Sequence, residues 1–161
     1  MKTAVLAPFA LVLGTLALAG CDSQPTQPPA APRTNAPEGI SITDGRLVLP
    51  AVKGNPGAVY FTVHNDSADT ETIRHAAVKG AKSAMIHTVT VLDGKADMEE
   101  MPQVPVPAHG QLAFEPGKLH VMAMDLDDTL QKGGTTDVTL EFAGGDQAEF
   151  PVQILAAGDA R

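Results

Sequence analysis

The chain has 161 residues, 43% of them hydrophobic and 19% charged, which suits one globular domain with a short appendage. Acidic residues outnumber basic ones 19 to 11, and the formal net charge of −8 argues against nucleic acid as a partner, because phosphate binding needs a surplus of lysine and arginine. A single cysteine excludes an intramolecular disulfide, a zinc ribbon and a Cys-x-x-Cys redox site. The polarizable side chains are instead six methionines, alongside no tryptophan and one tyrosine.

Residues 1–20 have the layout of an export signal, with one lysine followed by an apolar run too short to span a bilayer as a helix. The segment ends in Leu18-Ala19-Gly20-Cys21, which resembles a bacterial lipobox. We therefore expect a lipoprotein signal peptide over 1–20, a lipidated Cys21 and a periplasmic protein anchored to the membrane. Asp22 resembles the inner-membrane retention signal of some Gram-negative lipoproteins. Ala17-Leu18-Ala19 also fits ordinary signal cleavage, which would give a soluble periplasmic protein.

The segment 21–38 reads as a linker that begins at the lipidated cysteine. It contains five prolines and almost nothing to bury, which predicts a disordered, partly polyproline tether. The folded domain is expected over 39–157, followed by a short tail at 158–161.

From residue 39 onward, the dominant period is two. Apolar and polar residues alternate over 136–142 and 148–154, and 58–64 is rich in β-branched and aromatic residues. These segments predict an all-β Greek-key β-sandwich, with a small barrel as the alternative. Turns are predicted at Asp44-Gly45, Asp93-Gly94, His109-Gly110, Pro116-Gly117, Gly133-Gly134 and Gly144-Gly145. Three further residues are expected at an edge or in a loop: Pro102, Pro105 and Pro107.

No enzyme motif stands out. The sequence contains no Gly-x-Ser-x-Gly elbow, no phosphate-binding loop, no His-Glu-x-x-His and no Gly-x-Gly-x-x-Gly after a strand. We therefore predict a protein that is not an enzyme.

Histidine and methionine recur at strand spacing. Met85 lies two residues before His87, and His120 lies two residues before Met122, so each pair presents an imidazole and a thioether on one face of a strand. A lone methionine usually packs in a core, and a lone histidine usually lies on the surface. Two such pairs favour a metal site as strongly as they favour these structural roles. The other histidines lack a methionine companion and are interpreted as structural or surface residues: His64, His75 and His109.

Ten residues separate His87 from Met98, twenty-one separate Met98 from His120, and one separates His120 from Met122. This spacing resembles the H(M)x10Mx21HxM motif of the periplasmic CuA chaperone family, PCuAC. The similarity extends over about 100 residues. It includes 57–63, which resembles the first long strand of the family, and 106–110 with 115–124, which resemble its middle hairpin.

The resemblance implies a cupredoxin-like β-sandwich that binds one Cu(I) per monomer and supplies copper during cytochrome c oxidase assembly. The implied ligands are His87, Met98, His120 and Met122, with Met85, Met101 and Met124 as auxiliary sulfur donors. The implied partners are the CuA subunit of the oxidase or its thiol-bearing assembly factors, and the implied membrane contact is the lipid anchor alone.

The sequence departs from the family at two places. The run Met98-Glu99-Glu100-Met101-Pro102 lacks the basic residue that usually follows the middle methionine, so Met98 and Met101 both stay open as ligands, with the spacing favouring Met98. The chain also lacks the tail rich in histidine and methionine of some members, so no separate Cu(II) site is expected. The alternative functions are copper storage or tolerance, a metal-free immunoglobulin-like structural module and a zinc-dependent hydrolase.

Overall fold

The computed structural model describes residues 36–159, and ten strands with no helix form this part of the chain. The predicted signal peptide, Cys21 and most of the predicted tether lie outside the described residues. The strands are β1 (Ile40–Val48), β2 (Gly57–Asn65), β3 (Glu71–Val78), β4 (Ala81–Leu92), β5 (Lys95–Glu100), β6 (Val104–Val106), β7 (Gly110–Phe114), β8 (His120–Leu126), β9 (Thr135–Phe142) and β10 (Gln147–Leu155).

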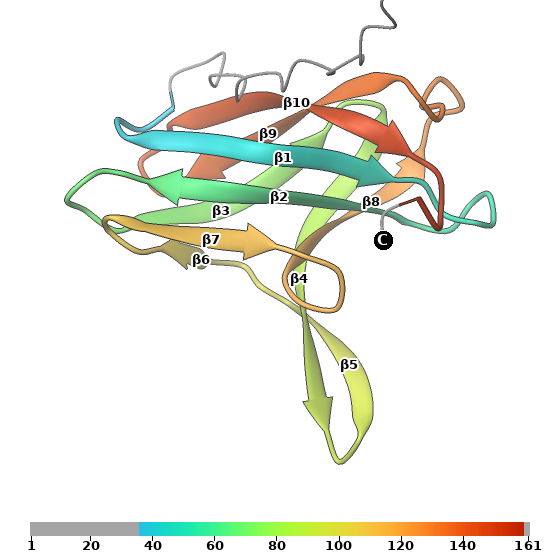
Figure 1. Ribbon diagram of the computed structural model, residues 1–161, viewed down its shortest axis with the longest axis horizontal. Coiled ribbons are helices and arrows are strands. Elements are labelled where there is room, and N and C mark those ends of the chain that lie inside the picture. Colours follow the sequence, from blue (N-terminus) through green and yellow to red (C-terminus); the bar gives the residue numbers. More distant parts are fainter. Residues whose placement is uncertain (1–35, 160–161) are drawn as a thin grey trace, which may run out of the picture.

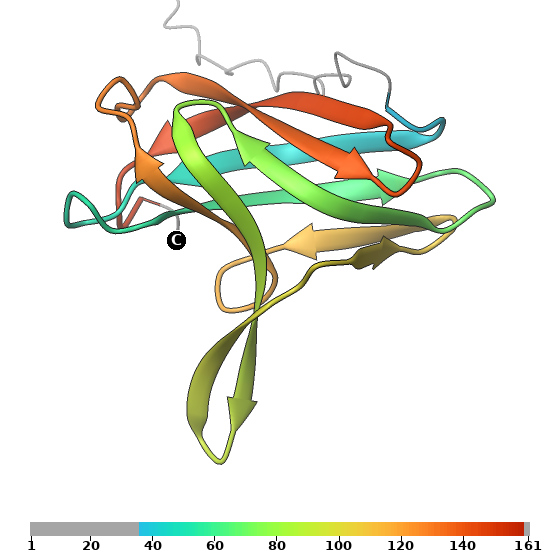
Figure 2. The ribbon, with the colours of Figure 1, turned by 180° about the vertical axis from the view of Figure 1, so that it is seen from behind.

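The strands form one hydrogen-bonded sheet that curls over on itself. Its order is β5-β4-β8-β2-β1-β10-β9-β3-β6, and β7 pairs with the second half of β2. In the described residues, β1 and β10 are the only parallel neighbours. Figures 1 and 2 show β3 and β9 on one side and β1 and β2 on the other, so the fold is the predicted β-sandwich. The predicted strand segments fall within β2, β9 and β10.

Alternating side chains of the strands fill the core between the two layers. Phe61 stacks on Phe114 with ring centroids 4.1 Å apart and meets Phe150 edge-on at 5.1 Å. Val59, Phe61 and Val63 of β2 point inward, and the residues between them point outward. Burying each such side chain stabilises the fold by about 1.5–3 kcal/mol. Period two therefore fixes which residues of β2 lie on the outer face.

The prediction of a turn at Asp44-Gly45 is wrong. Both residues lie inside β1, where the register with β2 shifts between Thr43 and Arg46 as a β-bulge. Asp44 adopts a left-handed φ of 58°, which aspartate tolerates better than most residues. A Cβ on Gly45 would lie 2.9 Å from Cγ1 of Val152, so the neighbouring strand requires a glycine there.

The turn at Asp93-Gly94 is correct, and it closes a hairpin that leaves the sandwich. The φ angles of 51° and 74° at these two residues are those of a two-residue type I′ turn. Figures 1 and 2 show the outer part of β4 together with β5 projecting away from the body. Every residue over 90–100 is exposed. The strand β5 is one edge of the sheet, and β6, which contains Pro105, is the other.

Candidate metal centre

The pairing of β4 with β8 brings the two candidate histidines together. His87 lies directly opposite His120, and Met85 lies opposite Met122. Directly opposite residues of an antiparallel pair share a face of the sheet. The two imidazole rings have centroids 6.2 Å apart and planes inclined at 56°. Two side chains separated by more than thirty positions in sequence therefore lie side by side, on a surface that we call the histidine face.

The pairing of β4 with β5 places Met98 on the same face. Met98 lies opposite Val89, which is two residues from His87, so Met98 is the diagonal neighbour of His87 across the hairpin. Met101 lies on the other side of the sheet. Its N–H donates to the carbonyl of the core residue Ile86 at 2.8 Å, and its side chain packs against the hydrophobic core.

The remaining methionines of β4 and β8 also lie on the histidine face. Met122 and Met124 alternate with the buried Val121 and Ala123, and Met124 lies opposite Ser83. Met85, Met122 and Met124 are half-buried. Met98 differs from them because 55% of its surface is exposed. The face therefore carries one exposed thioether on the hairpin and three partly covered ones on the sandwich.

A backbone hydrogen bond orients the ring of His120. Its Nδ1 lies 2.9 Å from the carbonyl oxygen of Lys118. Because a carbonyl oxygen can only accept, Nδ1 carries the proton in the neutral ring and donates it, which leaves the lone pair of Nε2 free. The turn before His120 holds this carbonyl, since Lys118 N–H donates to Glu115 O at 3.1 Å and the two side chains form an ion pair at 2.9 Å. An imidazole fixed in this way is prepared to bind a metal through Nε2.

His87 is the polar side chain that the fold leaves unsatisfied. Both of its ring nitrogens are buried, and neither has a hydrogen-bond partner within the described residues. An unpaired buried polar atom costs about 1–3 kcal/mol. A metal ion between His87 and His120 would bind one of these nitrogens and remove the cost of leaving that atom unpaired, so the donor set fits a metal.

The kind of metal follows from the other donors. The described residues contain no group of three or more histidine, cysteine, aspartate and glutamate side chains that could hold a metal ion. Additional ligands on the histidine face must therefore be thioethers. Neutral sulfur donors favour a soft monovalent ion over Zn²⁺ or Mg²⁺.

Tyr60 borders the site, and sequence analysis did not single it out. Its ring centroid lies 6.4 Å from that of His120, and the guanidinium carbon of Arg46 lies 5.1 Å above the Tyr60 ring. Burial raises the pKa of Tyr60 above its usual value, and the positive charge of Arg46 partly offsets this shift. Tyr60 is an outward-facing position of a predicted strand, but the sequence alone gave no register to place it beside His120.

The family model described as "Putative lipoprotein LpqE-like" matches residues 40–154, which is most of the chain and all ten strands except the last residue of β10. The chain belongs to the LpqE-like family. A comparison with curated protein sequences finds no match.

Solved structures similar to this LpqE-like chain are PCuAC domains, as the motif predicted. The Cu(I)-bound solution structure of DR1885 from Deinococcus radiodurans is 27% identical, with a TM-score of 0.58 over 82% of this chain and 85% of that one. The apo form of DR1885 is 25% identical, with a TM-score of 0.51 over 100% of this chain and 99% of that one. The copper-bound PCuAC domain from PmoF2 is 17% identical, with a TM-score of 0.62 over 76% and 97%. The resemblance to PCuAC and the cupredoxin-like sandwich are confirmed.

The three other histidines lie outside the histidine pair of this LpqE-like protein. His64 Nε2 is 3.1 Å from the hydroxyl of Thr43. His75 is exposed on β3. His109 is exposed in the turn before β7, where it adopts a left-handed φ of 50°. Their interpretation as structural or surface residues agrees with these positions.

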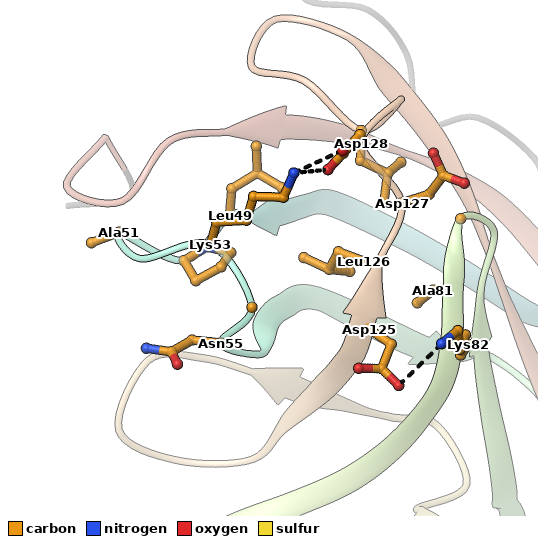
Figure 3. Close-up of a pocket in the computed structure, with 14 residues that line it drawn as sticks. Leu49, Ala51, Lys53, Asn55, Ala81, Lys82, Asp125, Leu126, Asp127 and Asp128 are labelled. Carbon is orange, nitrogen blue, oxygen red and sulfur yellow. Dashed lines mark hydrogen bonds and ion pairs between the residues drawn. The ribbon is translucent and has the colours of Figure 1, made fainter.

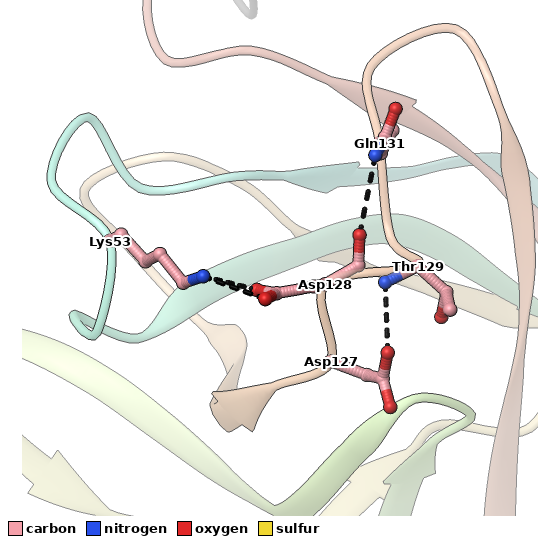
Figure 4. A network of polar contacts seen from close by, with 5 residues as sticks. All are labelled: Lys53, Asp127, Asp128, Thr129 and Gln131. Atoms are coloured by element: carbon pink, nitrogen blue, oxygen red, sulfur yellow. Dashed lines mark hydrogen bonds and ion pairs between the residues drawn. The ribbon is translucent and has the colours of Figure 1, made fainter.

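A groove of about 790 Å³ lies near the opposite end of β4 and β8, lined by the loop after β1, the start of β4 and the end of β8. Figure 3 shows its two ion pairs, Lys53 with Asp128 at 2.6 Å and Lys82 with Asp125 at 3.8 Å. In Figure 4, Thr129 N–H donates to Asp127 at 2.8 Å, and this bond lowers the pKa of Asp127. The carboxylates of the rim are thus engaged with neighbours, and none of the candidate metal ligands lines this groove.

Within residues 36–159, no helix is long and apolar enough to cross a membrane.

Proposed function

We propose that the protein is a copper-binding metallochaperone, not an enzyme, that holds one Cu(I) through His87, Met98, His120 and Met122. The observation that carries this proposal is the pair of opposed imidazoles on the histidine face. One ring has a free Nε2, and the other has two buried nitrogens that find no partner among residues 36–159. Similar solved structures support copper as the ion, since one is a copper-bound PCuAC domain and another is Cu(I)-bound DR1885.

The ligands divide into a fixed part and a replaceable part. His120 is 7% exposed and hydrogen-bonded through Nδ1, so it stays in place. Met98 is 55% exposed on the projecting hairpin, so an incoming ligand reaches it first. A thiolate of an acceptor would then replace the thioether of Met98 before the imidazoles dissociate from the ion. Four neutral ligands leave the charge of Cu(I) uncompensated, which favours transfer to a site with anionic cysteine ligands.

The proposed setting is the periplasm, with the chain anchored to the membrane through lipidated Cys21. The proposed acceptor is the CuA subunit of cytochrome c oxidase or a thiol-bearing assembly factor. Methionine suits such a compartment because it remains a ligand where free thiols are oxidised to disulfides. The lipoprotein description of the family model supports the anchor.

Competition for Cu(I) between the apoprotein and a chromogenic chelator tests the site. Removing a histidine ligand should weaken binding by more than the ~10–100-fold typical of losing an outer-shell partner. We expect His87→Ala and His120→Ala each to exceed that loss. The matched control is His64→Ala, which removes a half-buried histidine bonded to Thr43 and should leave the affinity unchanged. Wild-type affinity in the His87→Ala, His120→Ala double variant would contradict the proposal.

A deletion strain separates delivery from storage. Loss of cytochrome c oxidase activity at low copper is the result expected for delivery. Copper sensitivity with normal oxidase activity would assign the protein to copper storage or tolerance instead.

A further inference from the structure

Hydrophobic side chains gather on the β4–β5 hairpin, where no core covers them. In the described part of the chain, four large hydrophobic residues are exposed, and three of them belong to this hairpin: Val91 at 70%, Leu92 at 76% and Met98 at 55%. The fourth is Val52, on the loop after β1. Clustered exposed hydrophobic residues usually mark a surface that binds something.

The hairpin has two chemically different faces. The register pairs Val89 with Met98 and Val91 with Ala96, so these four side chains share the face of His87. The opposite face, which we call the reverse face, is mostly polar and carries Thr88, Thr90, Leu92, Lys95, Asp97 and Glu99. An apolar strip therefore continues the histidine face from the metal ligands outward along the hairpin.

The charge around this strip is negative. Over 93–100 the hairpin carries four acidic residues and one basic residue, all exposed: Asp93, Asp97, Glu99, Glu100 and Lys95. Glu100 lies opposite His87, at the inner end of the strip, and Asp93 lies at its tip. Acidic side chains around an apolar strip favour a partner with an apolar contact surface rimmed by lysine and arginine.

We propose that the apolar strip of Val89, Val91, Ala96 and Met98 is the docking surface for the copper acceptor. The acceptor is a protein whose thiolate copper site lies in an apolar surface with a basic rim. The proposal rests on the copper-delivery function above. A thiolate can reach an ion held beside Met98 only if the protein that carries it comes against this face of the hairpin.

The dimensions of the hairpin agree with this assignment. Val91 lies four residues beyond His87, which is about 13 Å along a strand. Even a weak transient interface buries several hundred Å² on each partner, on the order of 500 Å². An acceptor that contacts the metal ligands therefore also covers the strip.

Two other molecules that could cover the apolar strip are less compatible with its negative charge. A second copy of the chain would bring two acidic hairpins together, and an anionic lipid surface would repel the same side chains. A protein with basic residues around its metal site is instead attracted by the acidic side chains of the hairpin. Its association should slow as ionic strength rises, because salt screens exposed charges over about 10 Å at 0.1 M.

The experiment compares substitutions at two neighbouring residues of β4, Val91 and Leu92. Val91→Asn alters the strip and Leu92→Asn alters the reverse face, at similar exposure and with no change of charge. Each Cu(I)-loaded protein is mixed with the apo CuA-bearing domain of cytochrome c oxidase from the same organism, and separately with dithiothreitol. We expect Val91→Asn to slow transfer to the domain about 5–10-fold, as loss of a central interface side chain does. Transfer to dithiothreitol and transfer by Leu92→Asn should keep the wild-type rate.

A second pair of variants tests the charge. Glu100→Gln, at the inner end of the strip, should weaken the salt dependence of transfer to the CuA-bearing domain, whereas Asp146→Asn, an equal change of charge in the turn between β9 and β10, should leave it as in the wild type. Equal salt dependence in Glu100→Gln and wild type would contradict the basic rim.

The possible failures are distinguishable. Apoprotein that does not bind Cu(I), or loaded wild type that transfers it neither to the domain nor to dithiothreitol, would overturn the proposed function. Normal Cu(I) affinity with equal transfer rates for Val91→Asn and wild type would overturn the docking surface alone. A dimer in sedimentation, or binding to phosphatidylglycerol vesicles, that Val91→Asn abolishes would assign the strip to a second copy or to lipid and also overturn it.

Discussion

The sandwich and the β4–β5 hairpin use the same hydrophobic residues in opposite ways. In the sandwich, Val59 and Leu47 are fully buried between two layers. On the hairpin, Val91 and Leu92 are 70% and 76% exposed. Core burial stabilises a fold, whereas hydrophobic residues that stay exposed on a projecting strand pair contribute little to its stability. The difference supports the proposal that the sandwich is the rigid part of the molecule and that the hairpin is its docking surface.

The proposed metal ligands are divided between the same two regions. His120 belongs to β8, in the sandwich, where its ring is buried and hydrogen-bonded. Met98 belongs to β5, at the edge of the sheet, where its thioether is exposed. His87 lies on β4, which runs from the sandwich into the hairpin. A site built across this boundary can hold an ion firmly on one side and release it on the other.

The largest expected difference between the two regions is in stability. Phe61→Ala removes a fully buried ring that packs against Phe114 and Phe150, and it should lower the free energy of unfolding by about 3–5 kcal/mol. Leu92→Ala removes a side chain of comparable hydrophobicity from the hairpin and should change it by less than ~0.5 kcal/mol. Urea denaturation of both variants measures the contrast. A loss above ~1 kcal/mol for Leu92→Ala would mean that the hairpin packs against the sandwich in solution.

The next effect concerns Met98, the proposed sulfur ligand of the hairpin. Met98→Leu keeps the volume of the side chain but removes the thioether, so we expect Cu(I) affinity to fall about tenfold, or ~1.4 kcal/mol. Met101→Leu is the matched change three residues away. Because Met101 packs against the core, that variant should keep its Cu(I) affinity and lose less than ~1.5 kcal/mol of stability.

Chelator competition on the two methionine variants decides whether Met98 or Met101 is the ligand. If Met101→Leu weakens Cu(I) binding and Met98→Leu does not, the hairpin must change its register when the ion binds. The two alternatives left open by the sequence would then be resolved in favour of Met101.

Much of the sandwich could be predicted from sequence because its strands alternate strictly. The segments 58–64, 136–142 and 148–154 bury one face each, and period two marks them directly. The bulge in β1 could not be predicted, because Asp44-Gly45 has the composition of a turn. The pairing with β2 on both sides of these residues and the packing of Val152 against Gly45 show that the strand continues.

The candidate site was predictable in its residues but not in its arrangement. The spacing of His87, Met98 and His120 indicates a family motif without saying which strands are neighbours. Which of Met98 and Met101 lies on the face of His87 depends on register, because a shift of one residue along β5 exchanges the two faces. The role of Tyr60 depends on the contact of β2 with β8, which no local pattern reports.

The smallest expected effect lies where the sandwich borders the site. Burial raises the pKa of Tyr60 above its usual value of about 10, and Arg46 opposes that shift, so Arg46→Gln should raise the pKa further. Tyr60 is the only tyrosine, and the chain has no tryptophan, so near-ultraviolet phenolate absorbance reports this group alone. The exposed Arg74 provides the control, because Arg74→Gln should leave the titration unchanged.

The sign of the effect on stability follows from the same shift. Above about pH 10 the unfolded chain releases the Tyr60 proton while the folded chain keeps it, so the free energy of unfolding falls as pH rises toward the folded pKa. In Arg46→Gln the folded pKa is higher, so this fall should continue to higher pH than in the wild type. A Tyr60 that titrates in the folded protein as it does in urea would show that its ring is open to water. His120 would then lack the cover that separates the fixed side of the site from the exchangeable one.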